Sequence, residues 1–201
     1  MRGAVGGAEG QNGCVVDNVW DGVTRSATLS DWAVEARHRL ADCAKAYDWP
    51  GVFAILAEHP EMVNASRPDG KSWYAPLHQA AYGGASADVV ERLVRQGAWR
   101  LLRTAAGDLP IDIARRNGQT HLLDVLKHRW TLDVRAEELA AIQDRFHRVI
   151  EGRVAKLVDE HGLRLPELVV LTELDRPEAW FAVPGMYGGF TYRLAGVSPF
   201  S

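Results

Sequence analysis

The chain has few cysteines and no long apolar run, and both absences restrict its class. It has 201 residues and only two cysteines, Cys14 and Cys43, which are too few for a four-thiolate zinc cluster or a disulfide framework. No stretch approaches the roughly 18 apolar residues of a membrane-spanning helix. The glycine-rich N-terminus also lacks the apolar core of a signal peptide. We therefore predict a cytoplasmic protein that does not bind membranes.

A basic excess is absent as well. The formal net charge is −3, from 23 Lys and Arg against 26 Asp and Glu, whereas a general nucleic-acid binder usually has a basic excess. Arginines gather between residues 92 and 116, and we interpret them as a solvated surface. We predict no nucleic-acid partner, and we leave the oligomeric state open.

Residue patterns typical of catalysis are missing too. Neither His-Glu-x-x-His nor Gly-x-Ser-x-Gly occurs, and Cys43 falls at a predicted core position, so nucleophilic catalysis lacks a candidate. Gly70-Lys71-Ser72 suggests a phosphate-binding loop, but Ala65 stands where that motif needs its first glycine. We therefore predict no catalytic residues, no cofactor and no metal site.

Two similar stretches, Pro76–Gly84 and Pro110–Gly118, lie 34 residues apart and predict two short helices of the same design. The proline that opens each stretch suits the first turn of a helix, where its missing N–H costs nothing. The glycine that closes each stretch can adopt the left-handed conformation that ends a helix. A third, weaker copy covers residues 40–64. A fixed period in the thirties is typical of stacked helix–turn–helix units.

These stretches resemble the ankyrin repeat. The resemblance rests on Pro76-Leu77-His78-Gln79-Ala80-Ala81 and on the glycines that follow, and it covers roughly residues 38–129 as three units. It implies a mainly α fold, an ankyrin-repeat solenoid of about three helix–turn–helix units over residues 30–130. It also implies that His78 tethers neighbouring backbone. The sequence departs from the family where Ala75 and Leu109 replace threonine, where Asp112 replaces histidine, and where three extra residues precede Pro76.

Segments of different character flank the repeats. Residues 1–29 are predicted to form a flexible N-terminal arm, with Val15, Val16, Val19 and Trp20 as side chains able to dock on the fold. Residues 131–201 are predicted to form an extension. It starts with an amphipathic helix over 134–161 that caps the last repeat. A small β-hairpin follows, with strands at 179–183 and 190–194. The motif at 180–190, Trp-Phe-x-Val-Pro-Gly-Met-Tyr-Gly-Gly-Phe, resembles the tail of some bacterial ankyrin proteins.

The resemblance implies a protein–protein interaction module, an adaptor with a protein partner of unknown identity. We expect Trp73 and Tyr74 near the tip of an enlarged loop, where aromatic side chains often anchor an interface; the alternative is that both rings fold back on the first repeat or on the N-terminal arm. Carried over from the family, the expected partner-binding residues are Asp69, Lys71, Trp73, Tyr74, Gln79, Tyr82, Arg103, Asp108, Asp112, Arg116 and Asn117.

A second functional hypothesis concerns the glycine-rich turn of the hairpin. Met186, Tyr187, Gly188 and Gly189 form a compact motif outside the repeats, and glycine lets backbone approach a ligand closely. The C-terminal extension would then be a small-ligand-binding or enzymatic unit displayed on a repeat scaffold. The alternative is that these glycines only satisfy the geometry of the turn.

Overall fold

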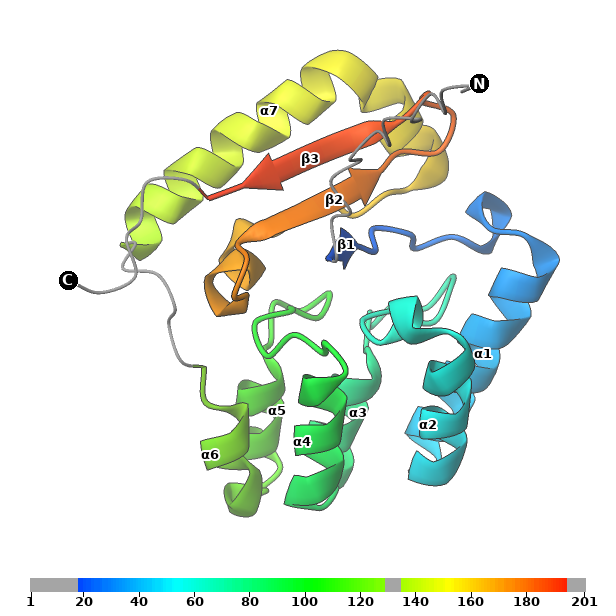
Figure 1. Ribbon diagram of the computed structural model, residues 1–201, viewed down its shortest axis with the longest axis vertical. Coiled ribbons are helices and arrows are strands. Elements are labelled where there is room, and N and C mark those ends of the chain that lie inside the picture. Colours follow the sequence, from blue (N-terminus) through cyan, green and yellow to red (C-terminus); the bar gives the residue numbers. More distant parts are fainter. Residues whose placement is uncertain (1–17, 129–134, 195–201) are drawn as a thin grey trace, which may run out of the picture.

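The structure is a computed structural model that describes residues 18–128 and 135–194. The described chain is mainly helical, as predicted, and has a small three-stranded sheet. Figure 1 shows two layers: three pairs of helices stand side by side in one layer, and the sheet with the longest helix, α7, forms the other.

The paired helices begin and end close to where the sequence predicts. Pro76 and Pro110 are the first residues of α3 and α5, and Gly84 ends α3 with a left-handed φ of 66°. Helix α3 packs between α1 and α5. The pairs are α1 (Asp31–Lys45) with α2 (Trp49–Glu58), α3 (Pro76–Gly83) with α4 (Ala87–Arg95), and α5 (Pro110–Arg116) with α6 (Leu123–Leu126). Short 3₁₀ helices cover Ser26–Thr28, Pro60–Met62, Thr120–Leu122 and Leu168–Glu173.

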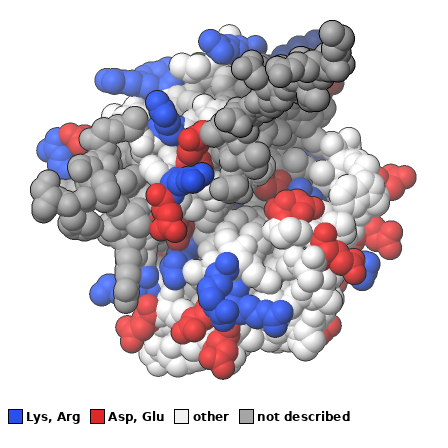
Figure 2. All heavy atoms as spheres, viewed as in Figure 1, with Lys and Arg blue, Asp and Glu red and all other residues white. Residues whose placement is uncertain are grey.

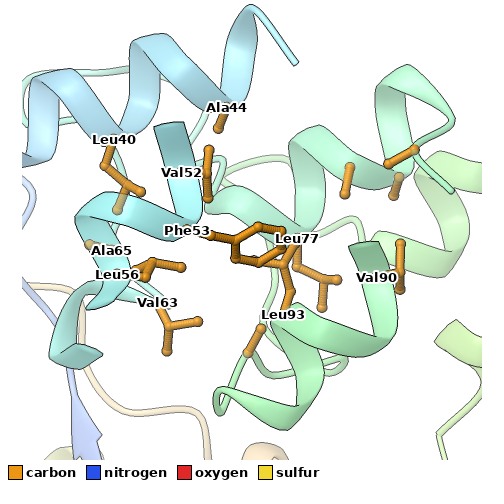
Figure 3. Close-up of a cluster of buried hydrophobic side chains, with 14 of the residues drawn as sticks. Leu40, Ala44, Val52, Phe53, Leu56, Val63, Ala65, Leu77, Val90 and Leu93 are labelled. Atoms are coloured by element: carbon orange, nitrogen blue, oxygen red, sulfur yellow. The ribbon is translucent and has the colours of Figure 1, made fainter. Parts of the chain in front are cut away.

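One hydrophobic core runs through the three helix pairs. Figure 3 shows side chains of the first pair, including Leu40 and Val52, beside Leu77 and Leu93 of the second pair. All four are at most 1% exposed, and burying each such side chain contributes about 1.5–3 kcal/mol. Ala80 and the residue after it are fully buried, so α3 approaches its neighbours closely. The helix pairs therefore stabilise each other across their contacts.

Helix α7 (Ala136–His161) belongs to the second layer and ends at Gly162 in a left-handed conformation. The prediction that it caps the last helix pair is wrong: α7 lies over the sheet, away from α6 (Figure 1). Ile150 is fully buried there, and the Phe146 ring lies 5.0 Å from that of Tyr192. The aromatic face of the sheet offers α7 more apolar surface than α6, which has only four residues.

The sheet joins the two ends of the described chain. Its order is β1 (Val19–Trp20), β2 (Glu178–Ala182), β3 (Gly189–Arg193); β1 is parallel to β2, and β2 is antiparallel to β3 as the hairpin prediction requires. Within the predicted arm, Trp20 docks on the fold as the sequence analysis allowed: it is 2% exposed and stacks on Trp99 at 5.7 Å. Its indole N–H also donates to the Arg164 carbonyl at 2.9 Å. Residues 1–17 of the predicted arm lie outside the described residues.

The two layers meet at the loops that end the helix pairs. Trp99, Leu101 and Leu102 of the loop before α5 are buried in the same core as the sheet. The carboxylate of Glu173 accepts hydrogen bonds from the backbone N–H of Arg100 and of Leu101, both at 3.1 Å. This side of the repeats is therefore covered by the chain itself.

Candidate partner-binding site

A groove with a volume of about 610 Å³ opens between α1 and α3. Its position leaves it free of the second layer, which covers the loop ends instead. Three tyrosines line it, and Tyr47 and Tyr82 are 44% and 50% exposed. We call this surface the inner groove; its lining residues are Ala41, Asp42, Lys45, Tyr47, Arg67, Gly70, Ser72, Tyr74, Gln79 and Tyr82.

Tyr47 is held in the groove by an uncommon backbone conformation. Its φ is 60°, a left-handed value that costs a residue other than glycine roughly 1–2 kcal/mol. The ring packs on Gly83 so closely that an added Cβ there would lie 2.2 Å from it. The first glycine of the pair in α3 therefore leaves space for Tyr47, while Gly84 ends the helix.

Tyr74 and Tyr82 form an aromatic pair on the α3 side of the groove. Their ring centroids are 6.4 Å apart in an edge-on arrangement, and Tyr74 also lies 5.6 Å from the ring of His78. Burial raises the pKa of Tyr74 above its usual value, so its hydroxyl stays protonated and can donate a hydrogen bond. Tyrosines of this kind present a rigid apolar body and a polar tip, which suits them to protein interfaces.

Charged side chains border the aromatic surface. Arg67 pairs with Asp42 at one rim, where both side chains are largely exposed, and such pairs contribute only about 0–1 kcal/mol to folding. Arg116 pairs with Asp108 at 2.6 Å on the α5 side. The rim can therefore exchange these ion pairs for contacts with a partner at little cost to folding. The face seen in Figure 2, where α2, α4 and α6 stand in front, also has interspersed basic and acidic side chains.

His78 is part of the scaffold, as predicted. It is fully buried; its Nδ1 accepts from the Ala75 N–H at 3.1 Å, and its Nε2 donates to the Leu102 carbonyl at 2.9 Å. Burial lowers its pKa to about 4, so the imidazole is neutral at physiological pH. Both ring nitrogens are used in linking consecutive loops, which leaves none for catalysis.

The predicted partner-binding residues divide into three groups: those at the groove, those on the α5 side, and those of the loop before α3. Tyr74, Gln79 and Tyr82 line the inner groove, and the ion pair of Asp108 with Arg116 lies close enough to influence the pKa of Tyr74. The remaining residues on the α5 side bond within their own segment. Those bonds run from Arg103 to the Gly107 carbonyl, from the Leu109 N–H to Asp112, and from Asn117 to the Ile113 carbonyl.

The enlarged loop before α3 differs from the expectation. Trp73 is half-buried with its ring 5.3 Å from the guanidinium of Arg164, which also lies 5.1 Å from the ring of Trp20 in the N-terminal segment. Asp69 accepts from the Ser26 N–H at 3.2 Å, and hydrogen bonding by the side chain and the N–H of Ser26 lowers the pKa of its carboxyl. Lys71 is exposed. The extra residues thus bring Trp73 onto the second layer, because Arg164 offers its ring a cation.

Seven groove residues were missed by the sequence analysis, among them Asp42, Lys45, Tyr47 and Arg67. Two of them could have been predicted from the third copy of the repeat. Aligning its Leu40 with Leu77 also aligns Asp42 with Gln79 and Lys45 with Tyr82. Tyr47 and Arg67 lie beyond the helix that this alignment covers, and no pattern in the sequence points to them.

The predicted ligand turn, Met186 to Gly189, leads from β2 into β3. The Trp180 ring lies over Gly189, where an added Cβ would be 2.7 Å from it. Gly188 has a φ of 123°, and Tyr187 is fully exposed while Met186 is half-buried against the sheet core. The Trp180 ring therefore covers the Gly189 backbone on that face, so a ligand has no room there.

Within residues 18–128 and 135–194, no group of three or more His, Cys, Asp or Glu side chains is placed to hold a metal ion. The helices of the same described ranges also lack one with the length and apolar character needed to cross a bilayer.

No family model matches the chain, and no curated protein matches it either. A solved structure that it resembles is described as "Bd0816 Predatory Endopeptidase from Bdellovibrio bacteriovorus in complex with immunity protein Bd3460". The sequence identity is 20%, the TM-score is 0.37, and the match covers 43% of this chain and 42% of that chain. So distant a likeness, over less than half of either chain, carries no argument about function.

Proposed function

We propose that this protein is an ankyrin-repeat adaptor that binds a protein partner in the inner groove. The observation that carries the proposal is the set of three tyrosines in one groove, two of them 44% and 50% exposed. Tyrosine and arginine are enriched among the residues that dominate binding energy at interfaces. The 34-residue period and the packing of α3 between α1 and α5 support the repeat assignment.

The rest of the molecule supports the same location for binding. The loop ends of the repeats are packed against the second layer, and His78 is committed to backbone contacts. The inner groove combines exposed aromatic surface with exchangeable ion pairs. It is therefore the surface of the repeats that best suits a partner.

A pull-down from the native host with two variants tests the proposal. Tyr82→Ala removes an exposed groove ring, whereas Trp32→Ala removes a 58% exposed ring from α1 that stacks on His59 outside the groove. We expect a protein retained by the wild type and by Trp32→Ala to be lost with Tyr82→Ala, at unchanged melting temperature. Equal capture by all three chains would contradict the groove assignment.

A further inference from the structure

The backbone of β2 determines which groups of β3 are free. The Trp180 N–H donates to the Asn18 carbonyl at 2.9 Å, so Trp180 directs its backbone groups toward β1. Successive residues of a strand direct their backbone groups to opposite sides. Ala179 and Phe181 therefore bond to β3 instead.

The outer edge of β3 consequently carries backbone groups that β2 does not use. Tyr192 stands opposite Ala179, and Phe190 stands opposite Phe181, so these two β3 residues bond to β2. Gly189, Thr191 and Arg193 must then direct their N–H and C=O groups away from β2. Across residues 18–128 and 135–194, no strand lies beyond β3. Proline, one of the devices that usually blocks an open edge, is absent from β3.

An exposed apolar stripe lies on α7 next to this edge. Ile142 and Val149 are 42% and 50% exposed. With Phe146 between them, they recur at the three- and four-residue spacing that places side chains on one helix face. Phe146 contacts Tyr192 of β3, and Figure 1 shows β3 running alongside α7. The stripe and the open edge therefore lie on the same side of the second layer.

We propose that β3 pairs with β3 of a second copy of this chain, antiparallel and about a two-fold axis near Thr191. In this register each Thr191 stands opposite the Thr191 of the other copy, and Gly189 stands opposite Arg193. The outward N–H and C=O groups then bond to each other. No like charges face each other directly, which would be destabilising, and the glycine leaves room for the arginine side chain.

A second copy suits this surface better than an isolated strand does. An extended peptide can satisfy the edge of β3, but it leaves Ile142 and Val149 in water. A two-fold axis perpendicular to the sheet keeps both α7 helices on the same face and brings their flanks together. The same patch then covers itself, as in the isologous interfaces of most homodimers. One contact thus accounts for the free edge and for the exposed stripe.

Sedimentation equilibrium of the full chain tests the proposal over micromolar to submillimolar concentrations. We expect a species with twice the chain mass of 22.2 kDa. Val149→Glu places a charge on the stripe and is expected to raise the dissociation constant by about tenfold or more, since this corresponds to roughly 1.4 kcal/mol. Trp32→Glu, which alters an exposed ring that stacks on His59, is the matched control and should leave the dimer unchanged.

Amide hydrogen exchange supplies an independent measurement. The Thr191 N–H is expected to exchange more slowly as the protein concentration rises, because it is covered only in the pair. Thr191→Pro removes this donor and should also weaken the dimer. A monomer at every concentration overturns the proposal. A dimer that resists both Val149→Glu and Thr191→Pro overturns it too, because its interface then lies elsewhere.

Discussion

A His78→Gln variant separates two contributions that this buried imidazole makes to stability. The first is the pair of hydrogen bonds to the Ala75 N–H and the Leu102 carbonyl. A glutamine amide can still donate to Leu102, but it no longer presents an acceptor to Ala75. An unpaired buried N–H costs about 1–3 kcal/mol. We therefore expect the variant to be about 2 kcal/mol less stable than the wild type at neutral pH.

The second contribution depends on pH, because burial lowers the pKa of His78 to about 4 from an ordinary value of about 6.5. Between these values the unfolded chain binds a proton at His78 and the folded chain does not. Stability from this residue is therefore fully present above the unfolded pKa and is lost as the pH falls toward the folded one. The wild type should lose about 2.5 kcal/mol between about pH 7.5 and pH 4.5 through His78 alone.

Urea denaturation of both chains at neutral and acidic pH measures the two contributions together. Every other titrating group is common to both chains, so the difference between them reports on His78. The gap of about 2 kcal/mol at neutral pH should close near pH 4.5. Only the wild type has a histidine that binds a proton in the unfolded chain, and this proton binding favours unfolding as the pH falls. A gap of the same size at both pH values would refute the lowered pKa and the burial argument behind it.

Substitutions at Glu173 and Gly83 test how the layers and the groove are held, with Gly152 as the control position. The carboxylate of Glu173 accepts from two backbone N–H groups of the loop before α5. Glu173→Ala should lower the free energy of unfolding in urea by about 3 kcal/mol, and Glu173→Gln should lower it less. An unchanged midpoint of unfolding for Glu173→Ala would contradict this. Replacing a helical glycine by alanine ordinarily gains up to about 1 kcal/mol, as expected for Gly152→Ala in α7, where the added Cβ meets nothing within 4 Å. Gly83→Ala should instead lower the melting temperature, because its Cβ collides with the Tyr47 ring.

The helices were the most predictable part of the fold because their signals are local. Pro76 and Pro110 start helices, and Gly84 ends one in a left-handed conformation. The apolar spacing between these signals predicts that Leu77 and Ile111 face the core; Leu77 is 1% exposed, and Ile111 is partly buried against the same core. Each helix depends on residues within about ten positions of it, so a repeated pattern is enough to place it. The assignment of these helices to the ankyrin family stays a prediction.

The contacts between the ends of the chain could not be predicted, because they join distant segments. Trp20 donates to a carbonyl 144 residues away, and β1 has only two residues, too few to show a strand pattern. Helix α7 was predicted, but its packing on the sheet was not. Periodicity shows which face of a helix is apolar, and it does not show which element covers that face. The groove was found on its α3 side only, because Tyr47 depends on a left-handed backbone that tyrosine rarely adopts.

The loop before α3 explains why the groove, and not the loop tips, is the better candidate surface. Asp69 and Trp73 both have left-handed φ values, 59° and 54°. Each such conformation costs roughly 1–2 kcal/mol, so it needs contacts that offset it. Asp69 is stabilised by its hydrogen bond from Ser26 in the N-terminal segment, and Trp73 is stabilised by the guanidinium of Arg164 in the second layer. The loop thus links the N-terminal segment and the second layer to the helix pairs. We infer that Trp73 is used within the protein, which leaves Tyr47, Tyr74 and Tyr82 to meet a partner.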